Sequence, residues 1–153
     1  MKWVTRERPK IDRIACPWLI ARFIDHEPEF LFVPPADVLA VARARDAIPY
    51  DVPDVELSHV GDLCSFDAFL CKYRLDDPAL AELAVIVRAA DTARPELAPQ
   101  AAGLLAISLG LSYTYRDDHE MLQHGLVMYD ALYAWCRHAR GETHTWNPAA
   151  LRA

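Results

Sequence analysis

The chain has 153 residues, of which 53% are hydrophobic and 25% charged, and its formal net charge is −6. This length and composition predict one globular domain with a sizeable core and argue against a disordered chain. The negative charge argues against direct nucleic-acid binding by this domain, which would need clustered lysine and arginine side chains. It is compatible with cation binding, although acidic chains are common.

The N-terminal residues carry no apolar segment like that of a signal peptide. No apolar run approaches the roughly 20 residues that a membrane-spanning helix needs. The four cysteines, Cys16, Cys64, Cys71 and Cys136, form no Cys-x-x-Cys pair. Buried, reduced thiols explain this pattern best, so we expect a cytoplasmic protein with no membrane partner.

The hydrophobic pattern predicts a single α+β domain, mainly helical, with a small sheet of about three short strands near the N-terminal half. The strands are expected over 3–5, 30–33 and 47–52. The helices are expected from between 12 and 17 to 25, then over 38–44, 66–73, 78–90, 100–111 and 117–137. The third of these helices is expected to be capped by Ser65, the fourth to start at Asp77-Pro78, and the last to be capped by Asp117 or Asp118. Two strands that flank the helix over 38–44 allow a βαβ unit, which would make them parallel.

Small and apolar residues dominate the helix over 100–111, which we therefore expect to be central. The domain is expected to cover residues 1–140, followed by a C-terminal tail over 141–153 that lacks periodicity. This tail is either an arm packed on the body, an arm packed on a second subunit in a homodimer, or disordered.

The helix over 117–137 has its polar chemistry at its start. At about 100° per residue, Asp117, Glu120 and His124 fall along one line of this helix, and His119 falls along another. A glutamate and a histidine four residues apart can bind one cation, and this ligand pair suits zinc, iron, manganese or nickel. The alternative is a solvated polar first turn followed by a core helix.

Two further candidates lie in the middle of the chain. His59 lies in the loop over 56–64, where ligands often bind, although a lone loop histidine is more often a surface residue. Asp91 ends a helix, where its charge is unfavourable against the helix dipole. It therefore needs a partner, either a bound cation or Arg94. Cys64 is either a redox thiol or a buried, inert one.

Arg22 follows Trp18 by four residues and so lies on the buried stripe of the first helix. A desolvated guanidinium needs an acidic partner, for which Asp25 is the local choice, or a bound anion. The planar donors of Arg13 and Arg22 suit tetrahedral oxyanions such as chromate, sulfate or phosphate.

Several ordered motifs across about residues 3–137 resemble the chromate resistance domain, which forms the C-terminal part of ChrB-type chromate resistance proteins and also occurs alone. The motifs are Asp12-Arg13-Ile14-Ala15, Trp18-Leu19-Ile20, Arg22-Phe23-Ile24-Asp25, His59-x-Gly61-Asp62-x-Cys64-Ser65-Phe66, Ala90-Asp91-Thr92, Asp117-Asp118-His119-Glu120 and Tyr129-Asp130-Ala131-Leu132-Tyr133-Ala134-Trp135.

The resemblance implies an association with chromate tolerance, as a regulator or as an accessory protein. DNA binding would belong to an extension that precedes this domain. The motif positions group His59, Asp91, His119 and Glu120, which strengthens the hypothesis of a site for a divalent zinc, iron or manganese ion. Gln100 stands where the family favours glutamate, so a metal bound there would be held more weakly or differently.

Three hypotheses follow. The first is a metal site between the loop around His59 and the start of the last helix, with the ligands His59, Asp91, His119, Glu120 and His124. Whether such a site turns over a substrate stays open. The second is oxyanion binding by Arg13 and Arg22, in a chromate-binding regulator or accessory module without catalysis. The third is thiol-dependent chromate reduction through Cys64.

Overall fold

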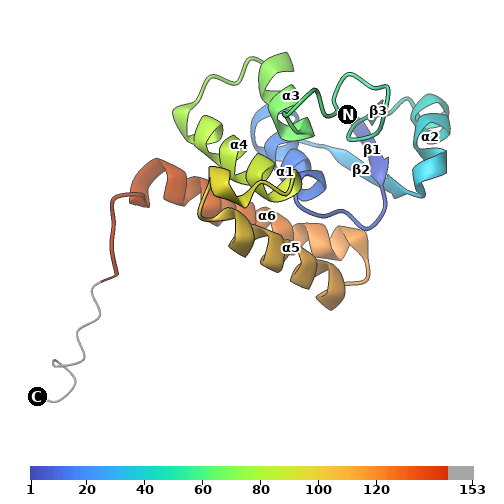
Figure 1. Ribbon diagram of the computed structural model, residues 1–153. Coiled ribbons are helices and arrows are strands. Elements are labelled where there is room, and N and C mark those ends of the chain that lie inside the picture. The colour runs from blue at the N-terminus through green and yellow to red at the C-terminus, as the bar shows by residue number, and fades with distance from the viewer. Residues whose placement is uncertain (145–153) are drawn as a thin grey trace, which may run out of the picture.

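Three short parallel strands organise the N-terminal half of the chain (Figure 1). β1 (Lys2–Arg6) lies in the middle, with β2 (Glu29–Val33) on one side and β3 (Ile48–Pro49) on the other. The strands before and after the helix over 38–44 are therefore parallel, as expected, but they do not pair directly, because β1 lies between them. β3 is shorter than predicted, since a proline has no N–H to donate to a sheet.

The computed structural model describes residues 1–144, so residues 145–153 of the expected tail over 141–153 lie outside the described residues. The predicted class, a mainly helical α+β domain, is confirmed. The helices are α1 (Asp12–Leu19), α2 (Val38–Arg45), α3 (Ser65–Lys72), α4 (Pro78–Asp91), α5 (Ala101–Thr114) and α6 (Asp118–Ala134). Shorter helical turns are η1 (Ile20–Ile24), η2 (Pro35–Asp37), η3 (Pro95–Leu97) and η4 (Trp135–Ala139). Within residues 1–144, no helix combines the length and the apolar character that crossing a membrane requires.

The two faces of the sheet pack against different helices. Val4 is fully buried in a small cluster with Val38 and Ala42 of α2. Trp3, which points to the opposite face because strand side chains alternate, joins the main core with α1 and α3. The small sheet is thus buried on both sides, as parallel sheets generally are.

The first helix begins at Asp12 and runs on through the π-helical turn η1 to Ile24. Pro17 is its sixth residue and so lies beyond the first turn, where it has no N–H to donate to the preceding turn. The helix does not stop there. It widens into η1 instead, and wider turns of this kind are often found at functional sites.

α6 packs along α1 and makes polar contacts with it. Gly125 approaches Ile14 closely, and the Tyr129 hydroxyl donates a hydrogen bond of 2.9 Å to the carbonyl oxygen of Ile11. The Trp18 indole N–H donates to Asp130 at 2.7 Å. These contacts attach the start and the middle of α1 to one neighbouring helix.

Two of the expected helix starts are confirmed and one differs. Asp77 accepts a hydrogen bond from the Ala79 N–H at 2.8 Å and caps α4. Asp117 accepts from the Glu120 N–H at 2.8 Å and caps α6. Ser65, expected as the cap of the third helix, is instead its first residue. Its side chain is free to bond elsewhere, which matters for the site described below.

The expectation that the helix over 100–111 is central is wrong. α5 lies on the outside of the domain, against α4 and α6 (Figure 1). Ala101, Leu104, Ser108 and Ser112 are its buried residues. The opposite side of α5 is apolar but exposed. The small and apolar residues of α5 thus predicted a helix suited to close packing, but they did not predict which elements it packs against.

Gly125→Ala tests the close contact between α1 and α6. A Cβ atom at Gly125 would lie 2.4 Å from Ile14 Cγ2, so this substitution should lower the free energy of unfolding by about 1–3 kcal/mol through overpacking. Adding Ile14→Ala removes the clashing methyl group. The cost of the double substitution, measured by urea denaturation, should therefore be smaller than the sum of the two single costs. Simple additivity would contradict the contact.

Candidate functional site

Three carboxylates, two buried and one largely buried, converge on one imidazole at the junction of the sheet and the helices. His59 Nε2 lies 3.1 Å from Asp91 Oδ2, 3.4 Å from Asp51 Oδ1 and 3.5 Å from Asp12 Oδ2. The side chains of Asp12, Asp51 and Asp91 are only 2%, 5% and 14% exposed, whereas that of His59 is 40% exposed. We call these four residues the acidic cluster. The carboxylates lie at the inner end of the cluster, and the imidazole is its most exposed group.

The ends of regular elements place these side chains. Asp12 is the first residue of α1, Asp91 is the last residue of α4, and Asp51 lies two residues after the end of β3. His59 comes from the loop between β3 and α3. The ends of α1, β3 and α4 lie close together, so polar side chains from segments far apart in the sequence meet here.

The backbone is strained beside two members of the acidic cluster. Ile11, which immediately precedes Asp12, has φ 48° and ψ −105°, and Asp51 has φ 51°. Positive φ is a genuine outlier for a β-branched residue such as isoleucine. Strain of this kind costs of order 1–3 kcal/mol and tends to persist where a site needs a particular geometry.

Hydrogen bonds fix the carboxylates of Asp12 and Asp51. The N–H of Ser65 donates to Asp12 Oδ2 at 3.2 Å, and its hydroxyl donates to Asp51 Oδ1 at 2.9 Å. The guanidinium groups of Arg6 and Arg13 lie 2.7 and 3.2 Å from Asp51 Oδ2. Asp51 therefore has two cationic partners of its own. Among residues 1–144, the one ion-pair partner of either Asp12 or Asp91 is His59.

The pKa values reflect this surplus of negative charge. A hydrogen bond with Asp12, together with the charges of Asp12, Asp91 and Asp51, raises the pKa of His59 from 6.5 to about 9. Burial, and then the neighbouring charges of Asp12 and Asp51, raise the pKa of Asp91 from 3.8 to about 7. Burial and the charge of Asp12 also raise the pKa of Asp51. A further positive charge would stabilise the ionised carboxylates of Asp51 and Asp91.

The cluster also offers a set of metal-ligand atoms. One ligand atom each from Asp12, His59 and Asp91 lies within 4.8 Å of the other two, and no other such group occurs among residues 1–144. Two carboxylates and one imidazole suit divalent zinc, iron or manganese. The exposed side of His59 leaves an approach for an ion from solvent.

Of the metal ligands predicted from the sequence, only His59 and Asp91 belong to this group. The His119 ring packs edge-on against Phe32, with the centroids 5.3 Å apart. The His124 ring stacks on Tyr115, with the centroids 4.1 Å apart. Glu120 is exposed. The structure thus does not bring the start of the last helix to the loop around His59. Asp12, and not His119, Glu120 or His124, lies with His59 and Asp91 in this group.

The guanidinium groups of Arg13 and Arg22 both have carboxylate partners. Arg22 donates to Asp130 from Nε at 2.9 Å and from a terminal nitrogen at 2.8 Å, so its partner is Asp130 and not the expected Asp25. Arg13 pairs with Asp51. Both arginines thus already neutralise a carboxylate, so their expected role as an anion site gains no support from these contacts.

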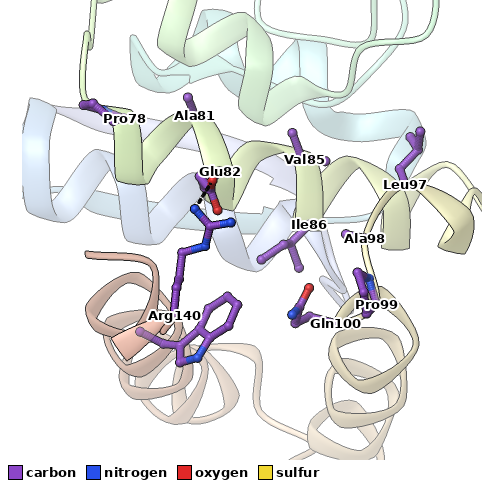
Figure 2. A pocket seen from close by; sticks show the side chains of 11 residues that line it. Pro78, Ala81, Glu82, Val85, Ile86, Leu97, Ala98, Pro99, Gln100 and Arg140 are labelled. Carbon is purple, nitrogen blue, oxygen red and sulfur yellow. Dashed lines mark hydrogen bonds and ion pairs between the residues drawn. The ribbon is translucent and has the colours of Figure 1, made fainter. Parts of the chain in front are cut away.

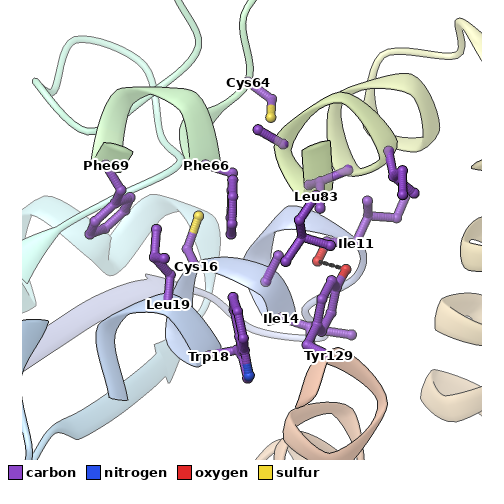
Figure 3. Packing of buried hydrophobic residues seen from close by; sticks show 14 of the residues in the cluster. Ile11, Ile14, Cys16, Trp18, Leu19, Cys64, Phe66, Phe69, Leu83 and Tyr129 are labelled. Carbon is purple, nitrogen blue, oxygen red and sulfur yellow. Dashed lines mark hydrogen bonds between the residues drawn. The ribbon is translucent and has the colours of Figure 1, made fainter. Parts of the chain in front are cut away.

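Cys64 lies in the core, together with Cys16 and Phe66 (Figure 3). Burial, and then the charges of Asp12 and Asp67, raise the pKa of the Cys64 thiol far above its ordinary value. Its N–H donates to Asp67 at 3.0 Å, so this residue caps α3. A thiol that stays protonated is a poor nucleophile and reductant. This favours a buried, inert Cys64 over a redox thiol.

Gln100 lies away from the acidic cluster. It lines a cleft of about 740 Å³ between α4, η3, the start of α5 and η4 (Figure 2). No member of the cluster lines this cleft, which is mainly apolar and carries the Arg140–Glu82 ion pair. Gln100 therefore faces a different cavity from the one beside His59.

Asp12 and Asp51 are the cluster members that sequence reasoning did not assign. Asp12 opens one of the family motifs, but an aspartate at the start of a helix is adequately explained as a favourable charge at the helix dipole. Asp51 follows a strand of a parallel sheet, and polar residues at the carboxyl ends of such strands commonly form sites. The position of Asp51 just after a strand was therefore the feature of the sequence that could have identified it as a site residue.

The raised pKa of His59 can be tested by the pH dependence of the free energy of unfolding. Because folding raises the pKa of His59 from 6.5 to about 9, its contribution to stability is complete below about 6.5 and is lost as pH rises through about 9. Urea denaturation of the metal-free protein should show this loss, and His59→Gln should weaken it. His119→Gln makes the same substitution outside the cluster and is the matched control. Parallel curves for wild type and His59→Gln would refute the assignment.

Comparison with known proteins places the chain in a family. A family described as "ChrB, C-terminal domain" matches residues 3–136. Protein ChrB of Cupriavidus metallidurans is 33% identical over 133 residues, which are 86% of this chain and 40% of that protein. The chain thus spans less than half the length of this relative, and no solved structure matches it. Since the family match covers nearly the whole described chain, this protein belongs to the ChrB C-terminal domain family and is a ChrB-type chromate resistance domain.

Proposed function

We propose that this protein binds a divalent zinc, iron or manganese ion through Asp12, His59 and Asp91, and that this site serves a role in chromate resistance. One observation carries the proposal: a single imidazole nitrogen lies within 3.5 Å of oxygens from three carboxylates, two of them buried and one largely buried. One N–H can donate a full hydrogen bond to only one of them. A metal ion, which accepts several ligands at once, fits this arrangement better.

A purely structural ion pair explains the site less well. Buried salt bridges stabilise a fold only when each charge is matched and its hydrogen bonds are satisfied. Asp51 is matched by Arg6 and Arg13, but Asp12 and Asp91 share one imidazole. An unmatched buried carboxylate costs several kcal/mol or takes up a proton, and the raised pKa of Asp91 shows this cost.

The ligand types narrow the choice of metal. A soft ion such as copper(I) prefers thiolate and thioether ligands, while magnesium and calcium prefer ligand sets made of oxygen alone. One imidazole with two carboxylates lies between these classes. A three-residue ligand set with an exposed side would leave coordination positions for water or another small ligand, and such an ion would act as a Lewis acid when bound. Arg13 and Ser65 would orient the neighbouring Asp51 and Asp12 carboxylates.

Family membership supports the link to chromate, either as a regulator or as an accessory protein. The chain spans only part of Protein ChrB, so the wider role of that protein is carried over here as a proposal. Chromate is the oxyanion that the family name suggests as a partner. Metal binding is a separate property from turnover of a substrate, and it is the property tested first.

Metal occupancy provides the direct test. Protein purified without a histidine tag, reloaded with zinc, iron(II) or manganese and dialysed, should retain about one ion per chain, because the ligand group is preformed. His59→Gln should lower the affinity by about tenfold or more. His119→Gln should leave it unchanged, since His119 lies outside the cluster. Elemental analysis below about a tenth of an ion per chain, or equal losses in the two variants, would contradict the proposed ligand set.

Asp91→Asn separates binding from stability. Removing one carboxylate relieves repulsion in the cluster, so the metal-free variant should be more stable than wild type at pH 8 by about 1 kcal/mol. The same variant should lose the rise in melting temperature that added metal gives wild type. Asp130→Asn, which removes the carboxylate paired with Arg22, should lower stability and keep the metal response. A destabilised Asp91→Asn protein would argue for a structural ion pair.

A further inference from the structure

The loop that carries His59 is attached to the body of the domain at its two ends. It lies between β3 and α3 (Figure 1), and we call residues 58–63 the His59 loop. Just before it, Leu57 is buried, and its carbonyl oxygen accepts a hydrogen bond of 2.8 Å from the Asp51 N–H. Just after it, Cys64 is buried and is the N-cap residue of α3. These two residues fix where the loop leaves the body and where it returns.

Between these ends, the backbone of the His59 loop bonds only to itself. Val60 and Leu63 exchange two hydrogen bonds, of 3.1 and 3.0 Å, across a tight turn in which Gly61 has φ 59°. Among residues 1–144, no backbone hydrogen bond joins the loop to any other segment. Residues 59–63 are all exposed. The loop is thus a small folded unit whose backbone is not tied to the sheet or to the helices.

The apolar side chains of the His59 loop add little packing. Val60 is 66% exposed and Leu63 is 44% exposed, and both line a hollow of about 290 Å³. Ala68 and Cys71 of α3 also line this hollow. A hollow forfeits the dispersion contacts that would otherwise hold its walls together. The loop therefore has space beside it and few contacts to lose when it moves.

Two charged contacts attach the His59 loop to the body, and they differ in quality. Asp62 lies 3.9 Å from Arg94, but its side chain is 89% exposed, and Arg94 is also paired with Glu96 at 3.3 Å. Exposed pairs of this kind stabilise a structure little. The other contact is that of His59 with the carboxylates of the acidic cluster. The imidazole is therefore the main attachment of the loop.

The carboxylates, in contrast, belong to fixed elements, since Asp12 begins α1 and Asp91 ends α4. His59 Nε2 lies 3.1 Å from Asp91 Oδ2 and 3.5 Å from Asp12 Oδ2. Two ligand atoms that bind one ion at about 2.1 Å in tetrahedral geometry are about 3.4 Å apart. The loop thus lies in the position from which His59 can bind an ion together with both carboxylates.

We propose that an ion bound by Asp12, His59 and Asp91 fixes the His59 loop in this position, and that the loop of the metal-free protein alternates between this position and open ones. This inference rests on the proposed metal site. Metal occupancy then determines where the exposed side chains of Val60 and Leu63 lie on the surface. Such a surface suits a regulator, because a partner that binds one arrangement of the loop responds to the ion.

Distances between two spin labels test the inference in the full chain. In a Cys71→Ser background, which removes the exposed native thiol, one label on Asp62→Cys reports the loop and one on Val127→Cys reports an exposed position of α6. Pulsed electron paramagnetic resonance should give a broad distance distribution for the metal-free protein. Zinc, loaded to about one ion per chain, should narrow it about twofold, because the ion removes the open positions. Labels on Leu39→Cys and Val127→Cys, which join α2 to α6, should show no change.

His59→Gln, made in the same labelled protein, removes the main attachment of the loop. It should broaden the distribution of the metal-free protein, and zinc should no longer narrow it. His119→Gln, outside the acidic cluster, should behave like the protein without it. A chain that holds one zinc ion with an unchanged distribution would overturn the role of the loop and leave the metal site standing, as would a His59→Gln loop as well ordered as before. A chain that holds no zinc would contradict the metal site itself.

Discussion

An imbalance of buried charge is the constraint on which the rest of this structure depends. Asp12 is buried and Asp91 largely so, and they share one imidazole between them. A fold can keep such a pair only if other interactions hold the carboxylates in place. Here that work falls to the starts of α1 and α3, to the serine at the start of α3, and to a backbone that adopts positive φ at Ile11 and Asp51. The fold thus accepts a local loss of stability and holds three carboxylates and one imidazole close together.

The sequence was informative about which residues are unusual and less informative about which of them meet. Asp91 at the end of a helix was recognisable because its charge opposes the helix dipole, and its partner proved to be His59. The polar first turn of α6 was equally conspicuous. Helical periodicity places Glu120 and His124 on one side of that helix, but it does not say which neighbour that side faces. The structure places His119 and His124 against aromatic rings instead.

The same limit explains the outcome for α5. Its composition indicated a helix built for close packing, and the exposed side fits that description as well as the buried side does. Composition reports that a surface needs an apolar neighbour, but it cannot say whether the neighbour belongs to the same chain. The three parallel strands show a related effect, since hydrophobic runs identified them while the order β2-β1-β3 came only from the tertiary arrangement.

The hydrogen bond from the Tyr129 hydroxyl to the carbonyl of Ile11 has a consequence for reading variants of this domain. It joins α6 to the strained residue that sets the direction of Asp12, so the last long helix acts on the acidic cluster without supplying a ligand. Tyr129 belongs to one of the family motifs. A substitution of Tyr129 is therefore expected to disturb the acidic cluster indirectly, through the backbone at Ile11. The Tyr129 side chain of α6 is thus best understood as a support that holds the backbone next to Asp12.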